Sequence, residues 1–307
     1  MRTHLTAFLS LSALVPLGAC WGTLGHRTVA YVAQKRLSSA GASYLAQLLQ
    51  DEDVSDAALW ADQIKRQRPQ TSGWHYIDAH DDPPNKCGVN YKRDCTKTGC
   101  VVSAIVDMTS RANDPSLSFD DHQEALKFLL HFIGDIHQPL HTEAEAKGGN
   151  GIKVLFGRRH TELHAIWDTD ILVKHEGGKS KDEPGQASDW ADRLVEAGGD
   201  SSWLKCADLG SAEKCALVWA GEANEYVCGY VLKDGVDGVT GGRDLSEDYY
   251  DGAVPIVDEL VAKAGFRLGE WINELATERA AMVARGVVFE GPKGRSGGKE
   301  QEVLEEL

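Results

Sequence analysis

Apolar residues recur at the spacing of an α-helix along most of the chain. Between residues 25 and 50, Val29, Val32 and Leu37 follow this spacing, with Gly41 as a weak point. The same pattern predicts further helices over residues 55–66, 101–112, 120–138, 188–198, 211–231 and 248–285. We therefore expect an all-α protein.

No stretch alternates strongly enough to predict a sheet domain, although residues 150–157 suit a short strand pair. The loops between helices are rich in Asp, Gly, Pro or Cys, as in residues 78–100 and 234–243. We see no internal repeat and no linker, so residues 21–290 are expected to form one mainly helical domain. Residues 291–307 lose apolar content and are expected to form a disordered tail.

The first twenty residues have the composition of a secretory signal peptide, with a basic start, an apolar run and small residues at Gly18 and Ala19. We expect the mature protein to begin at Trp21 and to be secreted. A membrane anchor is the first alternative, but the apolar run is shorter than the roughly 20 residues that a span needs. The second is lipoprotein cleavage before Cys20, which would tether the protein to a membrane.

The cysteines that follow Cys20 are six in number. In an oxidising compartment an even number favours disulfides over free thiols or a cysteine metal site. Six cysteines can pair in 15 ways. Loop lengths favour two short local bridges and one long-range bridge, namely Cys95–Cys100, Cys206–Cys215 and Cys87–Cys228.

The formal net charge of −15 argues against a protein that binds nucleic acid non-specifically over a broad surface. Such binding works by counterion release, which needs clustered Lys and Arg. A phosphate substrate would therefore need a local positive charge. Metal ions bound in a site can supply that charge in place of side chains.

The stretch HFIGDIHQPLH, residues 131–141, places ionisable side chains inside an otherwise apolar helix pattern. His131 and Asp135 are four residues apart and project from one face of a helix, so they can reach one ion together. Pro139 cannot continue the hydrogen-bond ladder, so we expect it to turn His141 away from the path of the helix.

A second pair, His164 and Asp168 in the stretch HAIWD, repeats the four-residue spacing. A lone histidine is more often an ordinary core or surface residue. Two such pairs favour metal binding, because imidazole and carboxylate are the ligands that zinc takes when thiols are tied up in disulfides. Further candidates, each with an ordinary structural explanation of its own, are the α-amino group of Trp21, His26, Asp62, His75 and Asp78.

With these motifs the chain resembles the S1/P1 nucleases, secreted zinc-dependent enzymes that cut single-stranded DNA and RNA and remove 3′-phosphates. The resemblance runs from Trp21 to about Leu275. It rests on the ordered motifs WGTLGH, WAD, HYIDA, CGVNYKRDCTKTGC, HFIGDIHQPLH, GGN, LHAIWD and YYDGAVPIVDELVAKAGFRLGEWINEL. It implies an all-α fold around three zinc ions (Zn2+).

By motif position the resemblance also implies the metal ligands, and every position carries the residue that the family pattern requires. The first zinc ion would be held by Asp62, His75, His131 and Asp135. Its close partner would be held by His26, Asp135 and the amino and carbonyl groups of Trp21. Asp135 would therefore bridge the pair. The third, more exposed ion would be held by His141, His164 and Asp168.

The implied mechanism uses a hydroxide that bridges the close zinc pair as the nucleophile, while the third ion neutralises the phosphate and the departing 3′ oxygen. In-line attack leaves a 5′-phosphate and a free 3′-hydroxyl. The resemblance makes Asp62, Lys65 and Asp135 the candidate catalytic residues, with Lys65 in contact with the phosphate. The alternative for Lys65 is a solvated helix lysine.

The resemblance further implies a binding site for an unpaired base. Tyr76 is at the stacking position of the family, and aromatic stacking tolerates any base sequence. Asp78 and Asn150 match residues that hydrogen-bond the edge of the base. A core role for Tyr76 and a turn role for Asn150 are the structural alternatives.

A few neighbouring residues depart from the family pattern or lie outside it. His137 is not among the family ligands, so we expect it to pack or to support a ligand. Glu162 stands where the family often has asparagine, which leaves the hydrogen bonding near the third zinc ion open. Arg158 and Arg159 suggest a contact with the phosphate chain, and solvent-exposed loop arginines are the equal alternative.

The expected substrates are single-stranded DNA, RNA and 3′-nucleotides, with no obligate protein partner evident. A zinc phospholipase C is the nearest rival, since that family shares the N-terminal tryptophan and a similar three-zinc helical site. Tyr76, Asp78 and Asn150 have no evident purpose for a lipid headgroup. A secreted protein that binds zinc without catalysis is the second rival, against which the complete ligand set and Lys65 weigh.

Overall fold

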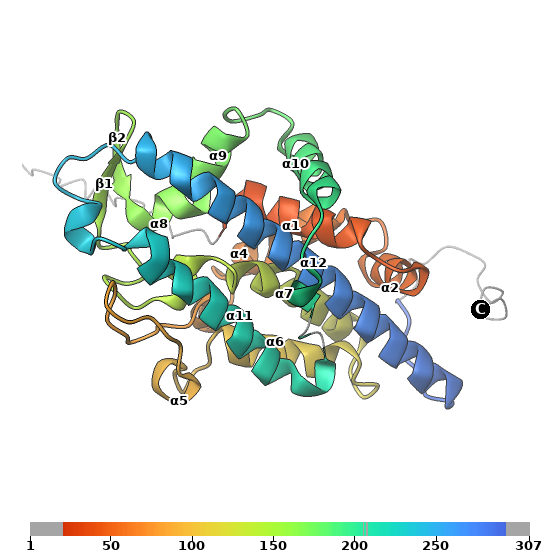
Figure 1. The fold of residues 1–307 in the computed structure, drawn as a ribbon. Helices are drawn as coiled ribbons and strands as arrows, with labels where there is room; N and C mark the ends of the chain where they lie inside the picture. The colour runs from red at the N-terminus through yellow and green to blue at the C-terminus, as the bar shows by residue number, and fades with distance from the viewer. Residues whose placement is uncertain (1–20, 205, 207, 293–307) are drawn as a thin grey trace, which may run out of the picture.

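The computed structural model describes residues 21–204, 206 and 208–292, which form a stack of helices with one small hairpin of strands (Figure 1). The mainly helical prediction is therefore confirmed. The expected signal peptide, and all but the first two residues of the expected tail, lie outside the described residues. Within this described part of the chain, no helix is long and apolar enough to cross a membrane.

Seven longer helices supply most of the structure, and short helical turns connect them. The longer helices are α1 (Thr23–Lys35), α2 (Ser39–Leu49), α6 (Val101–Ala112), α7 (Phe119–Asp135), α10 (Glu183–Ala197), α11 (Ala212–Tyr226) and α12 (Asp248–Ala284). The short α-helices are α3 (Val54–Ala57), α4 (Trp60–Ile64), α5 (Tyr91–Asp94), α8 (Leu163–Ala165) and α9 (Ile171–His175). The 3-10 turns are η1 (Pro69–His75), η2 (Pro139–Thr142), η4 (Ser201–Leu204), η5 (Leu209–Ser211) and η7 (Val236–Gly238), and the π turns are η3 (Ile166–Asp170) and η6 (Val227–Val231).

The first predicted helix is two helices in the structure. The chain leaves the helical path at residues 36–38, between α1 and α2, and not at the expected weak point Gly41. Ser38 starts α2 because its side chain accepts a hydrogen bond from the Gly41 amide (3.1 Å). The predicted helix over residues 55–66 is likewise split, into α3 and α4.

The other helix predictions differ from the structure mainly at their ends. α10 begins before the expected residue 188, because the Asp182 side chain accepts a hydrogen bond from the Gly185 amide (3.0 Å) and caps the helix. α11 ends at Tyr226 and passes into the π turn η6, where the sequence predicted one continuous helix.

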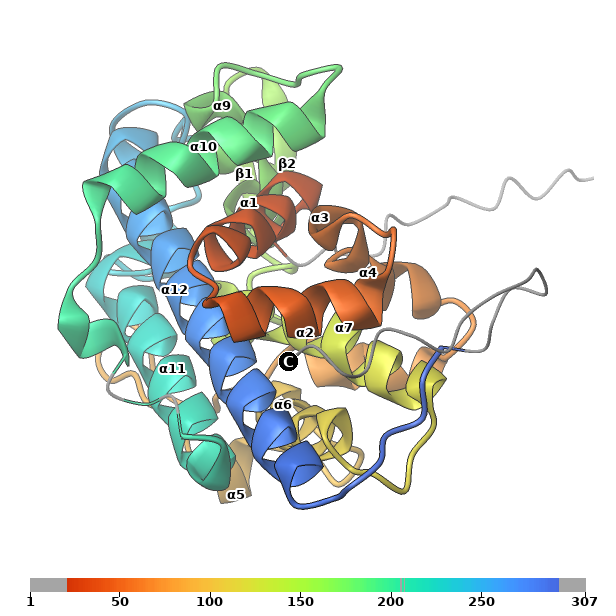
Figure 2. The same ribbon diagram turned by 90° about the vertical axis from the view of Figure 1, so that its right-hand side faces the viewer.

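Helix α12 runs diagonally through the molecule, with α1 and α2 on one side and α11 on the other (Figures 1 and 2). It packs against α1, α2, α7, α9 and α10. At Gly265 a Cβ atom would lie only 2.4 Å from the Cβ of Val32, so the close approach of α12 to α1 requires glycine. This contact fixes α1, whose first turn carries the candidate ligand His26 and which begins just after Trp21.

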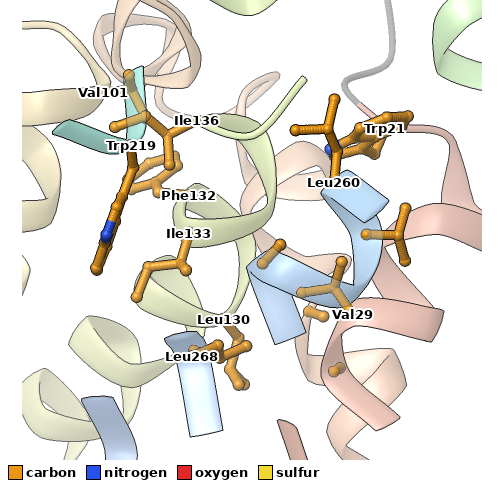
Figure 3. Packing of buried hydrophobic residues seen from close by; sticks show 14 of the residues in the cluster. Trp21, Val29, Val101, Leu130, Phe132, Ile133, Ile136, Trp219, Leu260 and Leu268 are labelled. Atoms are coloured by element: carbon orange, nitrogen blue, oxygen red, sulfur yellow. The ribbon is translucent and has the colours of Figure 1, made fainter. Parts of the chain in front are cut away.

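Helix α7 occupies the centre of the core, because every residue from Ala125 to Asp135 is buried. Figure 3 shows how its side chains pack toward different neighbours. Phe132 and Ile136 lie near Trp219 of α11, while Leu130 lies near Leu268 of α12. A helix that is buried all round is rigid, and it is therefore a suitable carrier for site residues.

The only strands among the described residues, β1 (Lys153–Phe156) and β2 (Arg159–Glu162), form an antiparallel hairpin. The expected strand pair at residues 150–157 was therefore partly wrong, because the second strand lies farther along the chain. The turn between the strands contains Gly157 with φ +63°, a left-handed conformation that glycine adopts without strain. The hairpin register places Lys153 opposite Glu162.

Three disulfides join distant and local parts of the chain, in the pairing that loop lengths favour. They are Cys87–Cys228, Cys95–Cys100 and Cys206–Cys215. The first has a sequence separation of 141 and ties the loop before α5 to the π turn η6, which follows α11. The last two close short loops within one region each.

Candidate metal centre and substrate cleft

The end of α7 places three candidate ligands close together. His131 and Asp135 are one turn apart on the same face, and the helix ends at Asp135. Gln138 is then extended, with φ −85° and ψ 120°, and Pro139 begins the short 3-10 turn η2. The chain therefore changes direction before His141, as the position of the proline predicts.

A first group of ligand atoms forms where α4 and η1 meet α7. It contains Asp62, His75 and His131, whose ligand atoms all lie within 4.8 Å of one another. His75 Nδ1 lies 2.9 Å from Asp135 Oδ2, and His131 Nε2 lies 3.2 Å from the same oxygen. The four residues expected around the first metal are thus together in the structure.

A second group lies on the other side of Asp135 and contains His26, His131 and Asp135. His26 Nε2 is 3.3 Å from Asp135 Oδ1, so the two oxygens of Asp135 face different groups. Trp21 is fully buried at the start of α1, and the Gly22 amide beside it donates to the carbonyl of Asp168 (2.6 Å). This contact anchors the start of α1 next to the other ligands.

A third group contains His141, His164 and Asp168. His164 Nε2 lies 3.1 Å from Asp168 Oδ2, and His141 Nε2 lies 3.6 Å from Asp168 Oδ1. Asp168 belongs to the π turn η3, which follows directly on the short helix α8 that carries His164. The Gln138 side-chain amide donates to Asp168 Oδ1 (2.6 Å) and fixes the carboxylate.

Backbone carbonyls orient three of these imidazoles. Because a carbonyl oxygen can only accept, Nδ1 must donate in each case: from His131 to Ala58 (2.7 Å), from His141 to His75 (3.0 Å) and from His164 to Gly148 (2.6 Å). Nε2 is then the free nitrogen for a metal. The sequence analysis did not predict these partners. Every residue carries a backbone carbonyl, so the residue type does not show which carbonyl accepts the hydrogen bond.

Gly134 is a second feature that the sequence did not single out. A Cβ atom at this position would lie 3.0 Å from His26 Nδ1. A side chain there would push His26 away from α7. The glycine in the motif HFIGD therefore allows α1 to bring His26 next to Asp135.

The charges of the close groups suit a bound cation. Burial lowers the pKa of His26 and, to about 4, that of His75, so both imidazoles are neutral at pH 7. Burial acts to raise the pKa of Asp135, but His131 and its other histidine neighbours hold it well below the usual value. Burial also acts to lower the pKa of His131, yet Asp135 and Asp62 raise it. The centre of the group therefore favours positive charge.

Several buried nitrogen and oxygen atoms in these groups have no hydrogen-bond partner in the described part of the structure, as expected of metal ligands. His26 Nδ1 and Nε2, His131 Nε2 and Asp135 Oδ1 are buried without a hydrogen bond of acceptable geometry within the described residues. Buried polar atoms of this kind are costly unless another partner satisfies them. A set of imidazole nitrogens and carboxylate oxygens is the donor set of zinc sites, so the residues fit this metal.

A fourth acidic group, Asp81 and Glu143 beside Cys87, is of a different kind. The sulfur of Cys87 is bonded to Cys228 and is not a thiolate ligand. Burial, with a contribution from Asp81, raises the pKa of Glu143 to about 8, so this carboxyl holds a proton at neutral pH. The group therefore lacks the donors of a transition-metal site.

A cleft of about 590 Å³ opens beside the first and third groups. It is lined by Lys65, Ser72, His75, Tyr76, Asp78, His80, Leu140, His141, Ala144, Lys147, Gly148, Asn150 and His164. The four residues expected to bind substrate, Lys65, Tyr76, Asp78 and Asn150, therefore share one cleft with metal-group histidines. Ser72, His80 and Lys147 are polar lining residues that sequence reasoning did not find.

The expected substrate residues have distinct surroundings. Tyr76 is 41% exposed, which excludes the alternative of a core residue. Lys65 Nζ lies 2.6 Å from Asp62 Oδ1, so Lys65 is tied to the first metal group. Burial raises the pKa of Asp78. The Asn150 side-chain amide donates to the Lys147 carbonyl (2.8 Å) and thereby also stabilises its own loop.

The less familiar residues now have defined partners. His137 Nδ1 donates to the carbonyl of Ile133 (2.7 Å) and Nε2 accepts from Arg267 (2.8 Å), so His137 packs outside the metal groups as expected. The Glu162 carboxylate pairs with Lys153 Nζ (2.5 Å), and His164 takes the Gly148 carbonyl instead.

The hypothesis of two phosphate-binding arginines in the hairpin loses part of its support. Arg159 forms an ion pair with Asp170, so its charge is already balanced next to the hairpin. Neither Arg158 nor Arg159 is among the residues that line the cleft.

Comparisons with known proteins bear on the same region. The family model described as S1/P1 Nuclease matches residues 21–277. Nuclease P1 of Penicillium citrinum is 42% identical over 267 residues, covering 83% of this chain and 97% of that protein. Nuclease S1 of Aspergillus oryzae is 40% identical over 275 residues, covering 87% and 95%. Endonuclease 2 of Arabidopsis thaliana is 32% identical over 278 residues, covering 83% and 90%.

The family match covers most of the described residues and includes every group of candidate ligands. The resemblance found in the ordered motifs is therefore confirmed, and the chain belongs to the S1/P1 nuclease family.

Proposed function

We propose that this protein is a secreted, zinc-dependent nuclease that cuts single-stranded DNA and RNA to 5′-phosphorylated products and removes the phosphate of 3′-nucleotides. Family membership makes it a hydrolase of the endonuclease type. The observation that carries the finer proposal is one cleft that connects metal-group histidines with an exposed aromatic ring and two base-edge candidates.

Three zinc ions are the complement that we infer. The first would be held by Asp62, His75, His131 and Asp135. The second would be held by His26, Asp135 and the backbone groups of Trp21. The third would be held by His141, His164 and Asp168. The opposite faces that Asp135 presents to the first two groups support its role as the bridging ligand.

The proposed ligand role of Trp21 requires a free α-amino group. We infer that residues 1–20 are a signal peptide that is removed on secretion, so that Trp21 becomes the first residue. The buried position of Trp21 beside His26 supports this inference.

Zinc ions, when bound, would lower the pKa of water so that it supplies a hydroxide nucleophile near neutral pH, and would add positive charge for the phosphate and the departing 3′ oxygen. The residues of the chain do the rest. Asp135 and Asp62 remain ionised because nearby histidines hold the pKa of each carboxyl below its usual value, so both can bind metal at neutral pH. Lys65, held at 2.6 Å from Asp62, can contact a phosphate oxygen at the edge of the same group.

The nucleoside part of the substrate would occupy the other end of the cleft. Tyr76 offers an exposed ring on which a base can stack, and a base inside a duplex is not available for this contact. Asp78 and Asn150 line the same cleft and can hydrogen-bond the edge of the base. Preference for unpaired strands then follows from the need to place one base in the cleft.

A zinc count combined with an activity assay tests the proposal. Purified mature protein should contain three zinc ions, begin at Trp21 and release acid-soluble nucleotides from denatured DNA. Asp135→Asn should lose zinc from the close pair and most of its activity, because one carboxylate serves two ions. Asp258→Asn is the matched control, since Asp258 also contacts a histidine (His175, 3.1 Å) but lies outside the metal groups.

Three outcomes would contradict the proposal. Normal turnover by a folded Asp135→Asn protein would exclude the bridging role. Release of phosphocholine from lecithin, with none of nucleotides from denatured DNA, would instead assign a phospholipase activity to the same cleft. A zinc-loaded protein without any phosphoesterase activity would favour a binding function.

A further inference from the structure

Lys147 lines the cleft, but neither the metal groups nor the proposed base contacts make use of it. It lies in a loop with an unusual backbone, because Ala146, Lys147, Gly148 and Gly149 all have positive φ, between 47° and 76°. For Ala146 and Lys147 this conformation is strained, since L-residues with a side chain rarely adopt it. The loop must therefore be held by its surroundings.

Contacts to site residues hold the backbone on both sides of Lys147. The Lys147 carbonyl accepts a hydrogen bond from the Asn150 side chain (2.8 Å), and the Lys147 amide donates to the Ala144 carbonyl (2.9 Å). The next carbonyl, that of Gly148, accepts from His164 Nδ1 of the third metal group (2.6 Å). The Lys147 backbone is therefore fixed relative to both Asn150 and the third metal group.

The ammonium group of Lys147 is placed to bind an anion. The side chain is exposed, and no carboxylate of residues 21–204, 206 and 208–292 lies within 4.0 Å of it. Lys65, the other lysine that lines the cleft, contacts Asp62 instead. In a protein with a net charge of −15, a lysine that lines a cleft without an ion-pair partner among the described residues is a local exception.

The polarity of the strand indicates which anion Lys147 meets. Under the proposed function, a nucleoside in the cleft presents its 3′-phosphate to the metal groups. A polynucleotide then leaves the cleft from the 5′ side of that nucleoside, where its next phosphate follows. We propose that Lys147 binds this 5′-side phosphate and so favours polynucleotides and nucleoside 3′,5′-bisphosphates over nucleoside 3′-monophosphates. This inference rests on the proposed function of the same cleft.

Two small substrates isolate the contact. Adenosine 3′-monophosphate carries only the phosphate that is removed, and adenosine 3′,5′-bisphosphate adds the one that Lys147 would bind. The measured quantity is the ratio of kcat/KM for the bisphosphate to that for the monophosphate. Lys147→Gln should lower this ratio about two- to fivefold, as expected for the loss of a solvent-exposed ion pair. Lys147→Glu should lower it further, and Lys147→Arg should restore it.

Lys153→Gln is the matched control, because Lys153 is an exposed lysine nearby that pairs with Glu162 and does not line the cleft. This variant should keep the wild-type ratio. The wild-type ratio should also fall as salt rises, since exposed charges are screened, and the Lys147→Gln ratio should depend less on salt.

An unchanged ratio in Lys147→Gln would overturn the inference, as would an equal loss for both substrates or a failure of Lys147→Arg to restore the ratio. Equal thermal stability and zinc content of the variants exclude a folding defect. If the wild type hydrolyses neither substrate, the proposed function itself has failed, and that outcome is distinct from an unchanged ratio.

Discussion

The contact between α12 and α1 allows one prediction to be worked out from distances. Gly265 is buried in α12, and an ideal Cβ at this position would lie 2.4 Å from both Cβ and Cγ1 of Val32 and 3.0 Å from the carbonyl oxygen of Val29. Real Cβ atoms do not approach so closely. In Gly265→Ala, the two helices must therefore separate by roughly an ångström, the difference from ordinary van der Waals contact.

The cost follows from two opposing effects. Overpacking in a core costs about 1–3 kcal/mol, while replacing glycine by alanine inside a helix favours folding by about 0.5–1 kcal/mol. Gly265→Ala should therefore lower the free energy of unfolding by about 1–2 kcal/mol. Gly221→Ala in α11 is the matched control, because no atom lies within 4 Å of its ideal Cβ. Only the favourable helix effect applies there.

Thermal unfolding followed by circular dichroism measures the difference. For a chain of this size, each kcal/mol moves Tm by about 2 °C, so the two variants should differ by about 3–6 °C in zinc-containing buffer. Because α1 carries His26, Gly265→Ala should also hold zinc of the close pair less tightly. A Gly265→Ala protein as stable as Gly221→Ala would refute the close approach of α12 and α1.

Three further predictions concern other parts of the molecule. Tyr76→Ala should lower kcat/KM on single-stranded DNA about tenfold, and Tyr76→Phe should not, because the ring does the stacking. Glu143→Gln should raise Tm relative to wild type more at pH 8 than at pH 5, because burial raises the pKa of Glu143 from 4.5 to about 8 and folding then retains a proton that the unfolded chain releases. Replacing both Cys87 and Cys228 by alanine should cost about 4–5 kcal/mol in urea unfolding, since the disulfide closes a loop with a separation of 141 residues.

Sequence spacing predicted the parts of the site that one helix determines. His131 and Asp135 share a face because a helix turn fixes them, and Pro139 redirects the chain because of its own ring. The meeting of α1 with α7 is different. It depends on tertiary packing at Gly134, so only the resemblance to a known family pointed to His26 as a partner of Asp135.

Tertiary contacts also explain why the role expected for Gly41 was wrong. Gly41 was expected to weaken the first helix, but it lies in the first turn of α2, where a Cβ would be 2.3 Å from the Asn273 side chain. That same side chain accepts a hydrogen bond from the Ser38 amide (2.8 Å). Gly41 is therefore needed for the contact between α2 and Asn273 of α12. Asn273 is 235 residues away from Ser38 in the sequence, so no local sequence pattern predicts this contact.

The hairpin is a second place where the partner of a side chain could not be predicted from the local sequence. The role of Glu162 stayed open in the sequence because its neighbours depend on strand register. Once β1 and β2 pair, Glu162 faces and pairs with Lys153, while His164 Nδ1 donates to the Gly148 carbonyl. Register is set by the turn at Gly157, and the predicted strand pair at residues 150–157 had not placed that turn correctly.

Asp135 links folding to metal binding. Its carboxylate is fully buried and lies 2.9–3.6 Å from imidazole nitrogens of His26, His75, His131 and His141, which come from α1, η1, α7 and η2. These elements meet only in the folded chain, so the ligand set does not exist before folding. A buried carboxylate is costly unless a cation compensates its charge. A bound metal therefore stabilises the same arrangement that positions the substrate cleft, and loss of the metal should weaken the fold as well as the activity.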